Sequence, residues 1–227
     1  MVKVLVVIPY EETRIHFEKV IKRYQGKGVS FTITSLFGTD YRRLQMVKNY
    51  DIVVVRGMTR SAISSFFPEI PIVPIAINVS DLLEALLEVK NLYGSHSKVG
   101  VLYSDAFMCS ETTISSLISM EINMRTISNE VEMIERINEL KNKGCNVFVG
   151  GLTLQRYCSS RKMPVVSLKT GVETIEKSIQ EAFNSAFIIR KERLHVDLLK
   201  SISDNLMEPL IVSNGKNEVV AYNIQEK

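Results

Sequence analysis

The sequence predicts an α/β protein of two duplicated lobes. Each lobe is doubly wound (Rossmann-like or chelatase-like) around a four-stranded parallel sheet, and a ligand cleft lies between the lobes. Two observations carry this prediction. Short apolar runs alternate with longer amphipathic segments, and the order of these segments starts again near the middle of the 227 residues. Alternating strand and helix patterns are typical of parallel sheets covered by helices.

The first half of the chain reads as four strand–helix pairs. The strand patterns are KVLVVIP (3–9), VSFTITSLF (29–37), DIVVVR (51–56) and IPIVPIA (70–76). Two prolines favour an edge position for the fourth strand, because proline donates no hydrogen bond to a neighbouring strand. The helix pattern SDLLEALLEVKNLY then follows, with Asn78 or Ser80 as its expected cap and Gly94 as its end.

The second half repeats this order at a nearly constant offset. KVGVLYS begins at 98 where KVLVVIP begins at 3 (98 − 3 = 95), and VFVGGLT begins at 147 where VVVRGMT begins at 53 (147 − 53 = 94). MPVVSLKTGVETIEKSI matches IPIVPIAINVSDLLEAL with proline over proline (164 − 71 = 93). Landmarks that keep one order and one offset indicate an internal duplication.

The repeat also predicts the division of the chain. Residues 1–95 are expected to form the first lobe, and 96–171 the second. If the last helix of the first lobe crosses to the second, pseudo-symmetry implies that the helix from about Glu173 crosses back, so that about 172–200 belong to the first lobe. That helix needs a core because its apolar residues recur on one face: Ile175, Ile179, Phe183 and Phe187.

The two glycine motifs lie at strand ends, which is the edge where parallel sheets bind ligands. Their glycines can adopt positive φ and let a ligand approach the backbone, and the threonine of each motif can cap the next helix or donate its hydroxyl. Helix N-termini favour anions, and an arginine at a strand tip can fork a carboxylate or phosphate. The candidate ligand-binding residues are Arg56, Gly57, Met58, Thr59, Asn78, Ser80, Tyr103, Gly150, Gly151, Thr153 and Thr170.

Simpler interpretations of these residues stay open at this point. Glycine and threonine also make tight turns at strand ends, and Arg56 could be a surface arginine that pairs with Asp51 or Asp81. Asp105 follows the first strand of the second lobe and could line the cleft.

The expected binding mode places one carboxylate of the ligand against Arg56, whose guanidinium forks it. The rest of the ligand lies against the second glycine motif.

Composition and motifs exclude several classes of protein. The chain is 45% hydrophobic and 23% charged with a net charge of +3, which is ordinary for a globular protein and too small to imply nucleic-acid binding. No apolar run reaches the roughly 20 residues of a membrane helix. The three cysteines lack CxxC spacing and no signal peptide is evident, which favours a cytoplasmic location. The three histidines are isolated, so no metal and no cofactor are expected.

Catalytic signatures are not found either. The sequence contains no GxSxG, HExxH or GxxxxGK[ST] motif. Duplicated racemases carry a cysteine at the strand end of each lobe. Here Cys145 precedes its strand, Cys158 lies within a helix pattern and Cys109 follows a loop. A thiol-based racemase is therefore disfavoured.

Together the motifs resemble the N-terminal receptor domain of the propionate catabolism activator family, NtrC-class transcriptional regulators that depend on sigma-54. The resemblance covers about residues 1–195. It rests on DIVVVRGMTRSAI…IPIVPIAINVSDLLEAL, KVGVLY, INELKNKGCNVFVGGLTLQRY and MPVVSLKTGVETIEKSIQEAF. It implies a sensory domain that binds a small metabolite, a 2-methylcitrate-like carboxylate in the best-known members, and so relieves repression of an ATPase module.

The resemblance also assigns residues. Arg56, Gly57 and Thr59 match the family's arginine-glycine-x-threonine turn, and Gly150 and Gly151 match its paired glycines. Asp81 matches the aspartate that opens a helix. At that turn the family commonly has serine-glycine-tyrosine-aspartate, whereas this chain has Asn-Val-Ser-Asp at 78–81.

The end of the sequence is similar to the opening of a PAS domain. Leu194, Leu198 and Ile202 recur as on one helical stripe, and a strand, a turn at Asn214-Gly215 and a second strand follow. Residues 201–227 are therefore expected to be the truncated start of a PAS domain.

The leading hypothesis is a cytoplasmic receptor module and not an enzyme. Its expected partners are a small anionic metabolite, a second copy in a homodimer, and the AAA+ and DNA-binding domains of a full-length protein, which this sequence lacks. Neither a membrane nor nucleic acid is an expected partner of this region. A lyase or isomerase acting on a small carboxylate in the cleft, and a dimerisation module with a vestigial cleft, are the alternatives. A helix that runs into a PAS start favours signalling.

Overall fold

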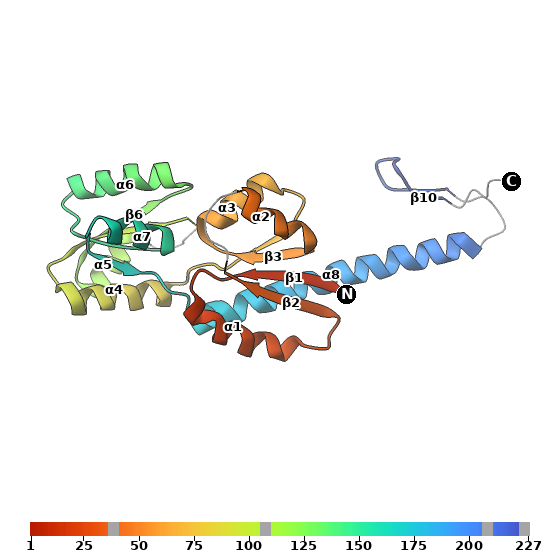
Figure 1. Ribbon diagram of the computed structural model, residues 1–227, viewed down its shortest axis with the longest axis horizontal. Coiled ribbons are helices and arrows are strands. Elements are labelled where there is room, and N and C mark those ends of the chain that lie inside the picture. The colour runs from red at the N-terminus through yellow and green to blue at the C-terminus, as the bar shows by residue number, and fades with distance from the viewer. Residues whose placement is uncertain (36–40, 105–109, 206–210, 223–227) are drawn as a thin grey trace.

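Two separate parallel sheets form the centres of two lobes in the computed structural model (Figure 1). The structure describes residues 1–35, 41–104, 110–205 and 211–222. The first sheet has the strand order β2-β1-β3-β4 and the second β6-β5-β7-β8, with every pair parallel. This confirms the predicted duplicated α/β fold with two doubly wound units.

Both lobes use the same succession of elements. The first sheet consists of β1 (Val2–Val7), β2 (Val29–Thr34), β3 (Ile52–Val55) and β4 (Ile72–Pro74). Its helices are η1 (Glu11–Thr13), α1 (Arg14–Ile21), η2 (Lys22–Tyr24), α2 (Tyr41–Leu44), η3 (Gln45–Asn49), α3 (Gly57–Phe66) and the crossing helix α4 (Val79–Tyr93).

The second sheet consists of β5 (Lys98–Tyr103), β6 (Glu121–Thr126), β7 (Val147–Gly150) and β8 (Val165–Ser167). Its helices are α5 (Glu111–Ile118), α6 (Glu130–Asn142), α7 (Leu152–Ser160) and the crossing helix α8 (Val172–Asn205). An antiparallel hairpin of β9 (Ile211–Ser213) and β10 (Val219–Tyr222) follows α8.

Burial explains why the central strands are rich in β-branched residues. All four residues of β3 are at most 1% exposed, because helices cover both faces of the sheet. β4 lies at the edge, as its prolines predict. Among the described helices, none combines the length and apolar character needed to cross a membrane.

The two lobes exchange their last helices. Leu82, Leu86 and Val89 of α4, which follows the first sheet, lie in one core cluster with β5 and β7 of the second. Ile175 and Ile179 of α8, which follows the second sheet, lie in one core cluster with β1 and β3. Each helix therefore buries its apolar face in the lobe from which it does not originate.

One residue of the expected α8 stripe is placed differently. Ile175 and Ile179 are buried and Phe183 is partly buried against Tyr24, but Phe187 is 56% exposed. The prediction was wrong for Phe187 because residues four apart advance about 40° around a helix of 3.6 residues per turn. After three such steps the side chain has rotated away from the lobe.

The packing of α8 can be tested by truncating one buried side chain. Ile179→Ala should lower the free energy of unfolding by about 2–5 kcal/mol, because it leaves a cavity in the core of the first lobe. Val196→Ala is the matched control on the same helix: Val196 is 61% exposed, so its change should stay within about 0.5 kcal/mol. Urea denaturation measures both, and equal effects would contradict the packing.

Candidate functional site

A cavity of about 390 Å³ lies between the lobes, at the carboxyl ends of both sheets. Seven of the candidate residues line it: Arg56, Gly57, Met58, Thr59, Tyr103, Gly151 and Thr153. The motif at the start of α3 and the motif at the start of α7 therefore meet at one cavity, as the duplication implies. Asp105 lies outside the described residues.

Arg56 is the residue that joins the two sides of this cavity. It is 9% exposed and stands directly after β3, at the N-cap position of α3. Its Nη1 donates to the Thr170 hydroxyl at 2.6 Å, and its Nη2 donates to the Leu168 carbonyl at 3.3 Å. Both acceptors belong to the segment between β8 and α8. Arg56 is thus a buried link between the lobes and not a surface arginine.

A second set of hydrogen bonds joins the two segments where the chain passes between the lobes, at the starts of α4 and α8. Asp81 on α4 is 5% exposed, and its carboxylate accepts from the Gly171 N–H at 2.9 Å and the Thr174 hydroxyl at 2.8 Å. The Asn78 side-chain amide donates to the Thr174 Oγ1 at 2.9 Å. A Cβ at position 171 would lie 2.5 Å from the Asp81 Oδ1, so only glycine fits there.

Four candidate residues do not line the cavity. Asn78 caps α4 in a capping box with Asp81, and Ser80 donates to the Asn78 Oδ1 at 2.8 Å. Thr170 holds Arg56 from the second lobe. These three residues lie where the chain passes between the lobes. The departure from the family pattern at 78–81 therefore changes the junction between the lobes and not the cavity lining. The fourth, Gly150, is the last residue of β7.

The glycines of the two motifs serve different physical needs. Gly57 has φ +70°, which favours glycine. Gly151 has φ −74° and open space around its Cα, so its freedom to adopt positive φ is not used in this structure. A Cβ on Gly150 would lie 2.5 Å from the Leu154 Cδ2 and 2.7 Å from the Leu102 carbonyl oxygen. Gly150 is therefore a packing requirement of the second lobe.

The threonines do not cap the helices, contrary to one expectation. Arg56 and Gly151 occupy the N-cap positions of α3 and α7, and neither position shows a side-chain capping bond. Thr59 and Thr153 lie within the first turn of each helix and line the cavity.

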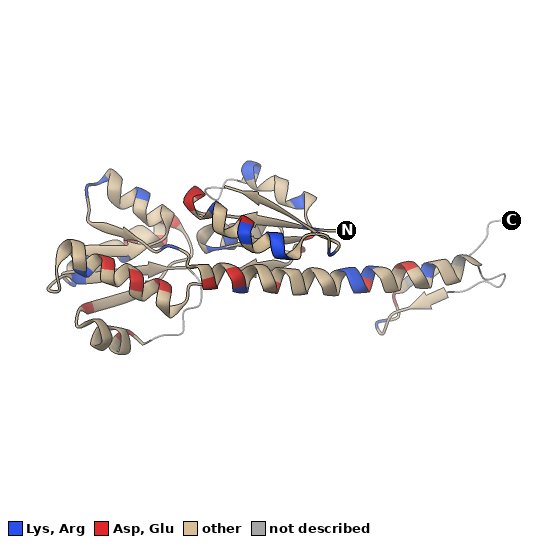
Figure 2. Cartoon of the chain, turned by 90° about the horizontal axis from the view of Figure 1, so that it is seen from below, with Lys and Arg blue, Asp and Glu red and all other residues tan. Residues whose placement is uncertain are grey.

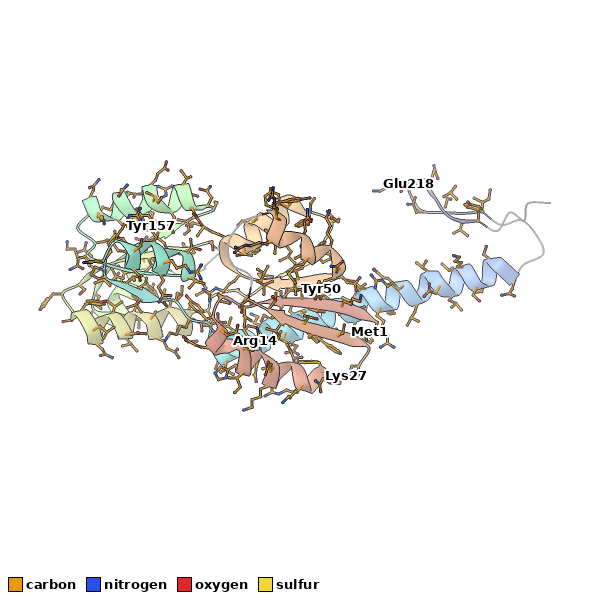
Figure 3. The ribbon with its side chains drawn as sticks, in the orientation of Figure 1. Met1, Arg14, Lys27, Tyr50, Tyr157 and Glu218 are labelled. Carbon is orange, nitrogen blue, oxygen red and sulfur yellow. The ribbon has the colours of Figure 1, made fainter. Side chains whose placement is uncertain are left out.

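Sequence reasoning missed several lining residues. On α7 the cavity face runs Thr153, Arg156, Tyr157 and Ser160, a spacing of i, i+3, i+4 and i+7; Tyr157 is labelled in Figure 3. This helical period in the sequence predicts one face of a helix that begins after the paired glycines. Two further lining residues carry no comparable signal: Glu130 of α6, and Tyr10, which directly follows the first strand pattern.

Charge in the cavity favours an anion. Among the described lining residues, Arg56 and Arg156 are cationic and Glu130 is acidic. The N-termini of α3 and α7 also lie at this edge, and the positive end of a helix dipole favours an anion. Burial raises the pKa of Tyr10, an effect that the nearby Arg56 opposes. The Tyr10 hydroxyl, which lies beside Ser167, therefore stays protonated at neutral pH.

Thiol and metal chemistry receive no support from the geometry. Cys145 and Cys158 are buried and neither lines the cavity. Burial raises the pKa of Cys158 to about 11, which makes it a poor nucleophile. Cys109 lies outside the described residues. Within the described chain, no three His, Cys, Asp or Glu side chains gather as a metal site requires.

The sequence of the chain matches a known protein family. The sequence profile described as propionate catabolism activator matches residues 38–192, which is 155 of 227 residues (192 − 38 + 1 = 155). The chain belongs to the propionate catabolism activator family. It is thus a regulatory domain of a transcriptional activator family. No curated protein sequence matches the chain.

A solved structure of a transcriptional regulator agrees on the fold. A crystal structure of an NtrC family transcriptional regulator from Clostridium acetobutylicum superposes with a TM-score of 0.69 at 18% identity, covering 82% of this chain and 97% of that one. The ligand-free, open structure of CD0873, a substrate binding protein with adhesive properties from Clostridium difficile, gives a TM-score of 0.33 at 13% identity, covering 80% and 84% of the two chains.

The two adjacent glycines of the second motif allow a matched test. Gly150→Ala should destabilise the protein by roughly 1–3 kcal/mol, because its Cβ meets a backbone oxygen and a packed leucine. Gly151→Ala should fold with nearly unchanged stability, because nothing lies within 4 Å of its Cβ. Thermal melts of the two variants measure this difference. Equal losses of stability would contradict the distinct roles of Gly150 and Gly151.

Proposed function

We propose that this chain is the ligand-sensing domain of a bacterial sigma-54-dependent regulator. In this proposal the cavity between the lobes binds a small anionic metabolite, and binding controls a downstream ATPase module. Membership of an activator family supports the regulatory role. The observation that carries the ligand proposal is the buried guanidinium of Arg56, which borders the cavity and bonds across the boundary between the lobes.

An anion is the ligand class that this arrangement favours. Two groups that accept hydrogen bonds from Arg56, the Thr170 hydroxyl and the Leu168 carbonyl, are uncharged oxygens. A carboxylate in the cavity offers Arg56 a charge-assisted, bidentate pair, which is stronger than a hydrogen bond to a neutral oxygen. Arg156 and the first turn of α7 add further donors from the second lobe, and the first turn of α3 lies next to Arg56 itself.

The hydrogen bond from Arg56 to Thr170 offers a route by which ligand binding regulates α8. Thr170 lies two residues before Val172, where α8 begins. A ligand that recruits the guanidinium competes with this contact and so changes the bond between the first lobe and the start of α8. Because α8 packs along the first sheet and continues beyond it, a change at its start has a structural route to its far end.

The remaining assignments are part of the same proposal. Residues 1–95 with about 172–200 form the first domain, 96–171 form the second, and 201–227 begin a PAS domain. The full-length protein carries AAA+ and DNA-binding domains, acts in the cytoplasm and uses this region as a sensor without catalysis. The hairpin β9–β10 after α8 supports the PAS assignment.

Binding can be tested with short di- and tricarboxylates in a thermal-shift screen. A carboxylate that binds the folded state should raise the melting temperature increasingly with concentration. With the strongest one, Arg56→Lys should bind more weakly than the wild type because it keeps the charge but loses the fork. Arg56→Ala should lose about 2–5 kcal/mol of binding free energy in calorimetry, since the pair is desolvated.

Two controls make this result interpretable. Arg43→Ala removes an exposed arginine on α2 and should leave affinity unchanged. Circular dichroism should show that Arg56→Ala stays folded, although it loses its bonds between the lobes. Unchanged affinity in folded Arg56→Ala would remove this arginine from the ligand site.

A further inference from the structure

The helix α8 is longer than the duplication accounts for. The repeat aligns 79–93, the whole of α4, with 172–186 of α8 at the offset of 93 (79 + 93 = 172; 93 + 93 = 186). The helix α4 ends there, whereas α8 continues for 19 more residues (205 − 186 = 19). We call residues 187–205 the extension. It runs past the end of the first lobe (Figure 1).

Two arginines fasten the beginning of the extension to the first lobe. Lys and Arg side chains gather on α8 where it passes the end of this lobe (Figure 2). The Arg190 Nη1 donates to the Lys27 carbonyl at 3.0 Å. The Arg193 Nη2 donates to the Asp51 Oδ1 at 2.5 Å. We call these two contacts the anchor. Lys27 precedes β2 and Asp51 directly precedes β3, so the anchor lies at the edge of the first sheet opposite to the cavity.

The repeat shows that the first lobe itself does not need a carboxylate at position 51. Asp51 and Asn146 occupy equivalent places (146 − 51 = 95), and each accepts a hydrogen bond from the neighbouring strand. The Lys3 N–H donates to the Asp51 Oδ2 at 2.7 Å, and the Lys98 N–H donates to the Asn146 Oδ1 at 3.0 Å. An amide oxygen is thus sufficient for this turn. The other carboxylate oxygen of Asp51 meets Arg193, whose hydrogen bond lowers the pKa of Asp51.

We propose that Asp51 and Arg193, assisted by Arg190, are positioning residues that fix the direction in which the extension leaves the first lobe. Asp51 directly precedes β3 and Arg56 directly follows it, so one buried strand separates the anchor from the cavity. The two residues are five positions apart (56 − 51 = 5), which is about 17 Å along a strand. The extension therefore moves with the first lobe, and not with the second, when a ligand changes the contact between the lobes. This last step rests on the proposed function, whereas the anchor itself does not.

The exposure of the ion pair indicates that it sets direction more than stability. The Arg193 side chain is 53% exposed and the Asp51 side chain 22% exposed. Ion pairs exposed to this degree contribute little to the free energy of unfolding. The first half of α8 is held separately by residues buried in the core, such as Ile175 and Ile179. Loss of the pair should therefore free the extension and leave the lobe folded.

Distances between two spin labels, measured by pulsed electron paramagnetic resonance without ligand, test this role. In a Cys109→Ser background the labels are attached at Ile15→Cys on α1 and Val196→Cys on the extension, which are 68% and 61% exposed. Dilution with unlabelled protein restricts the measurement to distances within one chain. The parent should give a narrow distribution of distances. Asp51→Asn should make it about twofold wider, because the amide keeps the turn but loses the ion pair that restrains the extension.

A second ion pair between α8 and the first lobe provides the matched control. Glu176 of α8 pairs with Arg23 at 2.7 Å, outside the extension, so Glu176→Gln should leave the distribution as narrow as in the parent. Arg193→Gln should widen it as Asp51→Asn does, and the double variant should widen it no further, since both remove the same pair. Arg193→Lys keeps the charge and should stay closer to the parent. Melting temperatures of all variants should stay within about 2 °C.

Two results would overturn the anchor. One is a distribution that Asp51→Asn leaves unchanged, and the other is equal widening by Glu176→Gln. Because no ligand is present, a wider distribution in Asp51→Asn supports the anchor even if no carboxylate binds in the cavity.

Discussion

The Asp81 carboxylate fastens together the two places where the chain passes between lobes. It accepts hydrogen bonds from the Gly171 N–H, the Thr174 hydroxyl and the Asn78 N–H, while only 5% of the residue is exposed. A buried carboxylate is tolerated only when donors of this kind compensate its lost hydration. The starts of α4 and α8 are thereby held side by side, and the relative position of the lobes depends on this junction.

The cavity is asymmetric because the two lobes carry different residues at one equivalent position of the repeat. Arg56 and Gly150 occupy the same place in the repeat (150 − 56 = 94). In the first lobe the side chain at this place leaves the sheet and reaches the segment before α8. In the second lobe even a Cβ would collide with Leu154 and the Leu102 carbonyl. Duplication therefore supplied two similar sheet edges, and packing allowed a long cationic side chain at only one of them.

The fold was predictable from the sequence because repetition constrains it. A strand order and a helix exchange that hold for one lobe hold for the other, and the central strands are marked by runs of β-branched residues. The site was predictable only where strand ends mark it, as at Arg56 and Gly151. The bond between Arg56 and Thr170 joins residues 114 positions apart, and no local pattern encodes it. The role of Gly150 depends on where Leu154 packs, which no local pattern shows.

Hydrogen–deuterium exchange, with and without the most stabilising carboxylate, tests the central claim most directly. If the anion binds between the lobes, amides in the first turns of α3 and α7 should both gain protection, because the two motifs line one cavity. Amides near Thr170 should also change, since the ligand competes for Arg56. Protection confined to one lobe, or to a surface away from both motifs, would contradict the account.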